Sequence, residues 1–528
     1  MKKTKKTLAL LLSVMMTMTV LVSCADNKNS SAHSVGGSAS ADKSTASASQ
    51  TGTPDTSKEV ALSMYLFGPN DGVSIPDIMT EINGKLKKDI NATIEFKGIE
   101  WSEVGTKYPL LFMSGEKFDM AFGGPNTAAP YSTLVAQGSL MDISGMLDTS
   151  APKLKKLIAP ETWDSAKIDG KLYAVPCNYT EMIPVGFVFR TDLMEKYGIE
   201  EINSLEQTEK YMQKVKENET FVAINGNSDT AWSLMDIFIA NTGKWIEAPG
   251  MPDKQLPLVA KDYEKPTEIS HPAFTQEFED WVVKMRDWND KGYFATDILS
   301  SQTGIKDNFN NGISGLYISH MMDWSGNAEA MAKVLPDTSS EFWSPDKSND
   351  KVMIQPYVNN MTLISASCEN PERSLMAIEK FMTDKSYYRL IQNGIEGRHY
   401  EIVDGIIQKP ASFDDKKDAF GFAAWALRND EFNLPLSSED PRRYTLIEEW
   451  KPDVIDNPYL GVYIDDTEIK TELSTIATID SQLGMQLLFG KTASDPKEAV
   501  VEYRNQLEAA GVQNVIDNVK AQISEQIG

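Results

Sequence analysis

Histidine and cysteine are the residue types best suited to hold a metal ion or to act as a nucleophile, and this chain of 528 residues has few of either. No two of the histidines have the spacing that places two imidazoles on one face of a zinc-binding helix. We therefore expect no metal site and no cofactor. The histidines are His33, His271, His320 and His399, and the cysteines are Cys24, Cys177 and Cys368.

Motifs of enzymatic catalysis are also missing from the sequence. Gly490-Lys491-Thr492 resembles the end of a phosphate-binding loop, but the earlier glycine that such a loop requires falls on Met485. The Gly-x-Ser-x-Gly elbow of serine hydrolases does not occur. With 76 acidic residues, some pair of carboxylates can always be drawn as a glycosidase dyad, so such pairs carry almost no weight. The sequence predicts a protein that is not an enzyme.

The N-terminus has the composition of an export signal. Four lysines precede an uncharged apolar run at residues 8–22, which is too short for a permanent membrane span. The run ends in Leu21-Val22-Ser23-Cys24, which matches the lipobox of bacterial lipoproteins. This resemblance implies that residues 1–23 are removed and that Cys24 carries the lipid, palmitate included, which anchors the chain to the outer face of the cell membrane. An ordinary secretory leader with an incidental cysteine is the alternative.

Composition changes sharply after the leader. Residues 24–58 are mostly small and polar, so they cannot offset the entropy of ordering and are expected to form a disordered tether. The remainder is long enough for two or more lobes. A net charge of −25 argues against nucleic acid and against anionic lipid as partners. Cys177 and Cys368 could form one disulfide, but two buried free thiols are favoured.

After the tether, strand and helix patterns alternate. Apolar residues have a period of two at 60–66, and they recur at four-residue intervals from Ile78 to Ile90, behind Pro76. A period of two returns at 92–96, and a second helix and a short strand are expected at 102–114 and 118–122. This βαβαβ order predicts an α/β fold with a mostly parallel, helix-covered sheet.

In such a fold, ligands bind at the carboxyl ends of the parallel strands. We expect those ends at 67–70 and 122–126, where glycines permit tight turns and close approach of the backbone to a ligand. Asn70 and Asn126 lie in these loops. The binding cleft is therefore predicted at this edge of the sheet.

Several segments, in consistent order, are similar to those of family 1 extracellular solute-binding proteins. WSEVGTKYPLLFMSGEKFDMAFG at 101–123 resembles the family's second helix and third strand, and KIDGKLYAVP at 167–176 resembles its hairpin before the first lobe crossover. FRTDLMEKYGI at 189–199, FNNGISGLY at 309–317 and NPERSLMAIEKF at 370–381 resemble later elements. GIEGRHY at 394–400 is similar to a segment found in a branch of Firmicute lipoproteins that carries a C-terminal domain of unknown function.

The resemblance implies a two-lobe, periplasmic-binding-protein-like fold of type II, in which each lobe is a mostly parallel sheet with flanking helices. Lobe 1 would begin at 59–180 and lobe 2 at 181–355. Residues 356–395 would return to lobe 1, 396–457 would be a second-lobe and hinge-associated segment, and 458–528 would be the C-terminal domain. Stretches 175–185 and 352–367 are expected to form part of a multi-strand hinge.

The resemblance also implies a function. It is that of a monomeric solute-binding lipoprotein of an ABC importer, which captures a sugar or oligosaccharide by hinge closure outside the cytoplasm and delivers it to the permease subunits. The alternative from another class is a receptor that presents its ligand to a membrane sensor kinase. A glycan-active enzyme and a surface adhesin are weaker alternatives.

A sugar site needs flat aromatic faces for the apolar sides of the rings and polar groups for the hydroxyls. Phe67 follows the first strand, Tyr179 lies at the first crossover, and Trp324 lies shortly after a segment where the family commonly places a contact. For every aromatic candidate, a place in the core is the alternative, and Arg398 and Glu396 could instead form a salt bridge. The predicted ligand contacts are Phe67, Asn70, Tyr179, Trp232, Trp324, Glu396, His399 and Tyr400, with Trp101 and Trp343 as further aromatic candidates.

Overall fold

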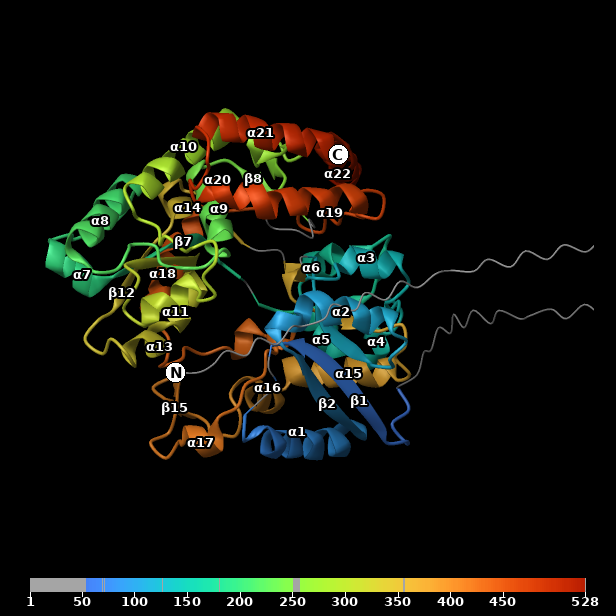
Figure 1. Ribbon diagram of the computed structural model, residues 1–528. Helices are drawn as coiled ribbons and strands as arrows, with labels where there is room; N and C mark the ends of the chain where they lie inside the picture. Colours follow the sequence, from blue (N-terminus) through green and yellow to red (C-terminus); the bar gives the residue numbers. More distant parts are fainter. Residues whose placement is uncertain are drawn as a thin grey trace, which may run out of the picture. The chain divides into compact units, whose positions relative to one another are not determined.

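A computed structural model of the chain describes residues 54–68, 70, 72–125, 127–179, 181–249, 257–354 and 357–527 (Figure 1). The predicted leader, the anchor Cys24, most of the predicted tether and Asn126 lie outside the described residues. Buried apolar side chains form two core clusters, one for each lobe. Lobe 1 draws its core from 62–175, 358–427 and Tyr463, and lobe 2 from 182–352 and 450–523. Each lobe is therefore discontinuous in sequence.

The sheet of lobe 1 has five strands in the order β2-β1-β3-β14-β6. Strand β1 pairs in parallel with β2 and β3, as the βαβαβ pattern predicted, whereas β14 is antiparallel to β3 and β6. The elements of this lobe include β1 Val60–Phe67, α1 Ile75–Ile90, β2 Ala92–Ile99, α2 Val104–Met113, β3 Met120–Gly123, β6 Ala174–Pro176, β14 Met361–Ile364, α15 Pro371–Thr383 and α16 Lys385–Gln392.

Helix α1 shows how the local sequence sets these elements. Its apolar residues, spaced by four from Ile78 to Ile90, are all buried, and Pro76 occupies its first turn, where a missing N–H is tolerated. The helix ends at Asn91, whose φ of 49° is a left-handed conformation that asparagine adopts more readily than most residues. The predicted strand, helix and strand are confirmed, and α1 packs against β2.

The sheet of lobe 2 has the order β11-β7-β12, and β7 is antiparallel to both neighbours. This differs from the mostly parallel sheet expected for each lobe. Elements of lobe 2 include β7 Val185–Arg190, α7 Thr191–Tyr197, α8 Leu205–Asn218, α9 Thr230–Asn241, α10 Gln276–Asp290, β11 Leu316–His320, α12 Met321–Gly326, α13 Ala328–Ala332, β12 Ser340–Trp343 and β13 Val352–Met353.

In each lobe, the strand that runs antiparallel to its neighbours is the first strand after the chain crosses from the other lobe. This strand is β7 in lobe 2 and β14 in lobe 1. Strand β7 follows the last strand of the first part of lobe 1, and β14 follows the return from lobe 2. The arriving chain enters the sheet where neighbouring strands end, because Val185 at the start of β7 pairs with His320 at the end of β11. Likewise, Met361 at the start of β14 pairs with Pro176 at the end of β6. An arriving strand must therefore run opposite to its neighbours.

The stretches predicted to form the hinge lie side by side. Met182 forms an antiparallel bridge with Ile354. A further stretch joins them, because Asn178 bridges in parallel to Asn429 and its side-chain amide donates to Asn429 Oδ1 over 2.8 Å. Several chain segments thus pass together between the lobes.

Residues 396–457 divide between the two lobes. Phe420, Phe422 and Trp425 pack against the core of lobe 1, whereas Trp450 belongs to that of lobe 2. This differs from the single second-lobe and hinge-associated segment expected here. The three lobe 1 aromatics follow neither a helical nor a strand period, so the pattern carried no sign of which core they join. The elements of this stretch include β15 Glu401–Val403, β16 Ile406–Gln408 and α18 Arg442–Trp450.

The C-terminal stretch packs on lobe 2. Apart from Tyr463, which packs in the lobe 1 core, its buried apolar side chains, among them Leu487 and Tyr503, belong to the lobe 2 core. Gly490 fits directly against α10, because a Cβ there would lie only 2.3 Å from the carbonyl oxygen of Met285. The helices of this stretch include α19 Lys470–Ile479, α20 Met485–Leu488, α21 Pro496–Ala509 and α22 Val512–Ile527.

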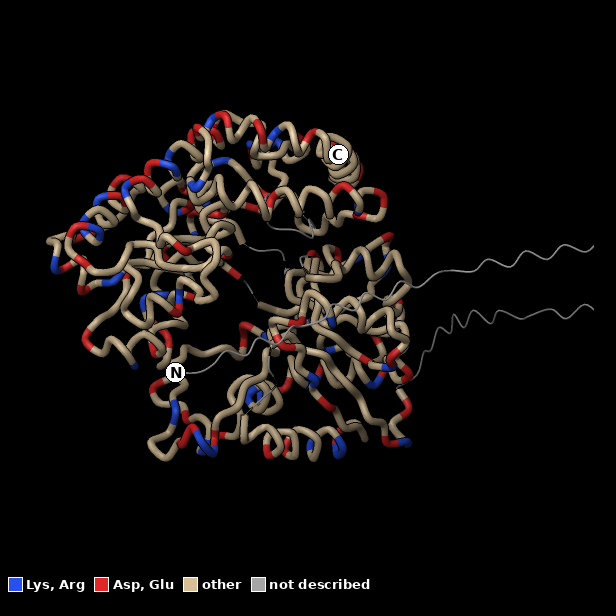
Figure 2. The backbone as a smooth tube through the Cα atoms, in the orientation of Figure 1, with Lys and Arg blue, Asp and Glu red and all other residues tan. Residues whose placement is uncertain are grey.

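Charged residues of both signs are interspersed along helices α8 and α10 (Figure 2). Lys210 pairs with Glu206 over 2.7 Å, and Arg286 with Asp290 over 3.0 Å. Exposed pairs of this kind contribute little stability each. Over the stretches that the structure describes, no helix combines the length and the apolar composition that crossing a membrane requires.

Candidate ligand-binding site

The carboxyl ends of the parallel strands in lobe 1 carry a group of aromatic rings. Phe67 is the last residue of β1, as predicted, but only 7% of it is exposed. Its ring packs edge-on against Tyr108 at 4.7 Å and against Phe122 at 4.8 Å, measured between ring centroids. The structure therefore places Phe67 at the predicted edge, with its ring inside the lobe 1 core.

Trp101 lies over this edge and is 53% exposed. Its indole stacks on Trp425, with a centroid distance of 5.5 Å and an interplanar angle of 27°. Gly68, whose φ is +80°, makes room for it, because a Cβ at that position would lie 2.9 Å from Trp101 Nε1. Two large apolar rings thus form a partly open platform at the strand ends, which we call the Trp101–Trp425 platform.

Asn70 supplies a polar group at the same strand ends. Its amide nitrogen donates to the carbonyl oxygen of Phe96, while its Oδ1 is buried and has no hydrogen-bond partner among the described residues. Buried polar atoms are nearly always satisfied, so an unpaired acceptor at a strand end is a candidate for a ligand hydroxyl.

Tyr179 lies at the first crossing between lobes, in contact with both. The guanidinium of Arg428 lies 4.0 Å from the centroid of its ring and pairs with Glu181. Its hydroxyl lies 3.9 Å from the sulfur of Met322 in lobe 2. Burial raises the pKa of Tyr179 to about 12, so the phenol is a neutral donor near neutral pH.

Trp324 lies on lobe 2, as expected, but only 1% of it is exposed. Its ring stacks on Phe342 at 5.5 Å, and Arg442 covers it at 5.3 Å. Its indole N–H donates to Ser340 Oγ over 3.0 Å. Because its faces and its polar atom are all engaged, Trp324 is a core residue in this structure.

The other two candidate tryptophans of lobe 2 differ in exposure. Trp343 is buried, stacks on Phe187 and donates from its indole N–H to Ser348 Oγ over 2.8 Å. Trp232 lies on α9 and is half-buried against the lobe 2 core. Of the two, only Trp232 keeps part of its ring accessible.

The segment around His399 is held by contacts that the sequence did not predict. Arg398 pairs with Asp77 at 2.6 Å and with Asp418 at 2.8 Å, instead of the salt bridge to Glu396 that we considered. Glu396 is exposed, and Tyr400 is buried. Arg398 therefore fixes this segment to α1 and to the chain before Phe420.

His399 is 3% exposed, and its two ring nitrogens differ. Nδ1 accepts a hydrogen bond from the backbone N–H of Ile395 over 2.8 Å, whereas Nε2 is buried without a partner among the described residues. Burial, assisted by the charge of Arg398, lowers the pKa of His399. The ring is thus neutral near pH 7.

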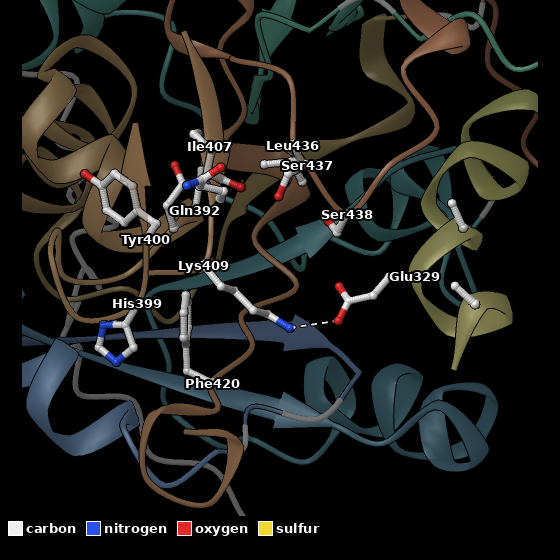
Figure 3. Close-up of a pocket in the computed structure, with 14 residues that line it drawn as sticks. Glu329, Gln392, His399, Tyr400, Ile407, Lys409, Phe420, Leu436, Ser437 and Ser438 are labelled. Carbon is white, nitrogen blue, oxygen red and sulfur yellow. Dashed lines mark hydrogen bonds and ion pairs between the residues drawn. The ribbon is translucent and has the colours of Figure 1, made fainter. Parts of the chain in front are cut away.

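His399 and Tyr400 line a cavity of about 640 Å³ (Figure 3). We call it the His399 cavity. One wall is formed by α13 of lobe 2, and the others come from within 392–409 and 420–438. Lys409 pairs with Glu329 over 3.0 Å, and thereby joins β16 to α13 across the cavity.

The two remaining cysteines are free and buried, which confirms the favoured prediction. Burial raises the pKa of both thiols, Cys177 and Cys368, to about 12. Thiols in this state are protonated and poor nucleophiles. Among the described residues, no group of three or more His, Cys, Asp and Glu is arranged to hold a metal ion.

Comparison with known proteins identifies the family of this chain. Residues 72–384 match the family described as bacterial extracellular solute-binding protein. The chain belongs to this family. A second match, to a domain of unknown function (DUF3502), covers 458–527. The predicted family resemblance is confirmed, and membership indicates a location outside the cytoplasm.

Relatives of this solute-binding protein include a carbohydrate ABC transporter substrate-binding protein from Streptococcus pneumoniae. It is 21% identical over 488 residues, which are 89% of this chain and 92% of the relative. A second relative is an uncharacterized ABC transporter extracellular-binding protein from Pyrococcus horikoshii. It is 23% identical over 258 residues, which are 47% of this chain and 55% of that one.

Solved structures share the fold. The N-glycan transport solute binding protein NgtS of Streptococcus pneumoniae has a TM-score of 0.69 at 18% identity, covering 88% of this chain and 99% of that one. An HMO-binding, ABC-transporter-associated solute-binding protein from Bifidobacterium longum infantis has a TM-score of 0.63 at 14% identity, covering 89% of this chain and 99% of that one. The predicted type II solute-binding fold is thereby confirmed.

The structure of this solute-binding protein separates the predicted contacts into groups. Phe67 and Asn70 lie at the strand ends, and His399 and Tyr400 line a cavity. Sequence reasoning missed Trp425, which completes the Trp101–Trp425 platform although it is more than 300 residues away along the chain. In the sequence, the only sign that Trp425 could belong to the site was its place among the aromatic residues that follow GIEGRHY.

Proposed function

We propose that this solute-binding protein captures a carbohydrate and delivers it to the permease of an ABC importer. The observation that carries the proposal is the partly open Trp101–Trp425 platform at the strand ends, beside the unpaired Oδ1 of Asn70. Aromatic faces stack on the apolar sides of sugar rings, and amides bind hydroxyls. The 21% identical relative, a carbohydrate ABC transporter substrate-binding protein, supports the same class of ligand.

The proposed contacts follow from where the structure places each candidate. Asn70 and Tyr179 bind beside the platform, and Trp232 and Glu396 are accessible to an extended ligand. His399 and Tyr400 contribute from their cavity. Phe67 and Trp324, whose rings are covered, act instead by packing: Phe67 supports the strand end beneath Trp101, and Trp324 stabilises lobe 2.

We further propose that capture proceeds by closure about the hinge. A ligand that contacts both lobes stabilises the arrangement in which they approach, and the permease recognises that arrangement. Tyr179 is placed for this role, because it belongs to the crossing and its hydroxyl lies 3.9 Å from Met322 of lobe 2. In this proposal the protein acts as a monomer, and the lipid on Cys24 holds it at the outer face of the membrane.

A thermal-shift screen of the soluble chain without its leader tests the ligand class. Neutral mono- and oligosaccharides serve as probes, with di- to pentapeptides as controls. A true ligand at about 100 times its Kd should stabilise the fold by about 2.7 kcal/mol and raise the unfolding midpoint. Solution scattering with the same sugar should show a smaller radius of gyration. Stabilisation by peptides and by no sugar would reject the proposal.

A further inference from the structure

We infer a role for the C-terminal stretch 458–527, which matches a domain of unknown function. Residues 459–466, which we call the strap, connect lobe 1 to lobe 2 beside the hinge and limit how far the lobes can open. The C-terminal helices hold the strap on lobe 2. The inference goes beyond the proposed function, because it concerns how the lobes move before a ligand binds.

Neighbouring residues of the strap are buried in different lobes. Val462 and Ile464 belong to the core of lobe 2, whereas Tyr463 between them belongs to the core of lobe 1. This alternation is typical of an extended segment, whose successive side chains point to opposite sides. Only 7% of Tyr463 and 1% of Ile464 are exposed. The lobes therefore cannot separate at this point unless one of these side chains leaves its core.

Lobe 1 holds the strap through Tyr463 and a polar contact beside it. The hydroxyl of Tyr463 donates to the carbonyl oxygen of Ser165 over 2.6 Å, and its ring packs edge-on against Tyr131 at 5.4 Å. Ser132 Oγ donates to the carbonyl oxygen of Ile464 over 2.8 Å. Withdrawal of the strap would leave these buried polar groups unpaired, which is unfavourable. The lobe 1 partners lie on helices α3 Tyr131–Ala136 and α6 Pro160–Ser165.

Two glutamines of α22 hold the backbone of the strap on lobe 2. Oε1 of Gln526 accepts the N–H of Tyr463 over 3.0 Å, and Nε2 of Gln526 donates to the carbonyl oxygen of Tyr463 over 2.7 Å. Gln522 makes the same two bonds with Asp465, over 2.8 Å and 2.9 Å. Side chains four residues apart on a helix are about 5 to 6 Å apart, and residues two apart in an extended chain are about 6.6 Å apart. The two amides thus match the strap as a neighbouring strand would.

The strap lies close to the covalent crossings between the lobes. Strand β17 Val454–Ile455, shortly before the strap, pairs in parallel with β13, and the residue after β13, Ile354, forms the hinge bridge to Met182. In lobe 1, α6 packs against β6, which ends at Pro176 where the first crossing begins. A contact close to the axis of a hinge moves little in a small rotation, whereas a wide rotation pulls it apart. The strap should therefore permit closure and oppose wide opening.

Distances between the lobes in the unliganded protein test the inference. Nitroxide labels on Lys88→Cys of α1 and Glu195→Cys of α7, both at exposed positions, report this distance by double electron–electron resonance. The whole chain is used with Cys24→Ala, so that no lipid is attached. Cys177 and Cys368 are buried, and their raised pKa of about 12 keeps both thiols protonated and poorly reactive toward the label.

Two tyrosines of the strap provide a matched pair of variants. Tyr463→Phe removes the hydroxyl that binds lobe 1, whereas Tyr459→Phe removes a hydroxyl that donates to the carbonyl oxygen of Pro266 within lobe 2 over 2.7 Å. Only Tyr463→Phe should shift the distance distribution toward longer values. The ratio of long to short distances should rise about fivefold, as the loss of one average hydrogen bond implies. Tyr463→Ala, which also removes the ring from lobe 1, should shift the distribution further.

The inference is overturned if the distribution is unchanged in both variants of Tyr463, or if Tyr459→Phe shifts it as much as Tyr463→Phe does. If Tyr463→Ala does not fold, Tyr463→Phe and Ser132→Ala decide, since Ser132→Ala removes the bond to Ile464 from the lobe 1 side. Unchanged distances in both of these variants then overturn the inference. No sugar is added in this experiment, so a sugar screen without a ligand would reject the proposed function and leave the role of the strap standing.

Discussion

Replacing Trp101 by alanine removes one half of the platform that we assign to ligand binding. The structure makes this substitution informative, because Trp101 is 53% exposed and is not a central core residue. Its main packing partner is Trp425, stacked at 5.5 Å. Loss of that stacking should cost about 0.5 to 1.5 kcal/mol of stability beyond the lost burial, which a domain of ordinary stability tolerates.

The expected loss of affinity follows from the open area of the ring. A tryptophan side chain offers on the order of 250 Å². With 53% of the residue exposed, about 130 Å² is open, and a sugar ring on one face would cover about half of that. At about 25 cal/mol per Å², this contact contributes about 1.5 kcal/mol. We therefore expect Kd to rise about twelvefold in Trp101→Ala.

Calorimetry with the tightest neutral oligosaccharide, together with an unfolding midpoint, measures both effects. Trp101→Phe keeps a smaller aromatic face and should lose only about threefold in affinity. Phe274→Ala is the matched control, since Phe274 is a 38% exposed aromatic in the segment Pro272–Phe274 of lobe 2. A Kd in Trp101→Ala equal to that of Phe274→Ala would refute the platform and the reasoning from exposed aromatic area.

Three further outcomes are expected. Trp324→Ala should lose about 3 to 5 kcal/mol of unfolding free energy in urea, with little change in the affinity of the folded fraction, because its ring is in the lobe 2 core. Cys24→Ala should abolish labelling by a radioactive fatty acid and release the protein from membranes. Burial lowers the pKa of His271 to about 3. As pH falls below the ordinary histidine pKa of about 6.5, His271 is therefore protonated in the unfolded chain but stays neutral in the folded chain. Stability should therefore fall by about 1 to 2 kcal/mol between about pH 7 and pH 5, and His271→Asn should remove most of this slope.

Each of these predictions can be contradicted by a specific result. An affinity loss in Trp324→Ala larger than its loss of stability would return that ring to the site. Labelling of Cys24→Ala at the wild-type level would disprove the anchor. Urea unfolding curves with the same pH slope in His271→Asn and the wild type would show that another group is responsible. The asparagine oxygen can still accept the N–H of Ala273, which His271 Nδ1 accepts at 3.2 Å.

Local pattern determined the first half of lobe 1. The period of two at β1 and the spacing of Ile78 to Ile90 in α1 depend only on neighbours along the chain, because each side chain's direction follows from its own element. For the same reason the sequence located the strand ends, where Phe67 and Asn70 lie. The ordered family segments added the class of protein, which residues 72–384 confirm.

The ion-pair partners of Arg398 and the direction of strand β7, in contrast, were decided by tertiary structure. Arg398 had several carboxylates within reach along the sequence, and only the packing of α1 against the segment before Phe420 selected Asp77 and Asp418. Strand β7 runs antiparallel because the chain reaches it through the hinge, which is a property of the connections and not of its residues.

The sequence by itself predicted a leader with a lipobox, and it determined the α/β fold and the aromatic candidates at predictable strand ends. It did not determine which aromatic rings remain exposed, since nothing in the sequence distinguishes the exposure of Trp101 from that of Trp324. Phe342 and Arg442 then cover Trp324, while Gly68 leaves room for Trp101 to stack on Trp425. Exposure of a ring is the sum of contacts from distant segments, so only the tertiary structure could decide it.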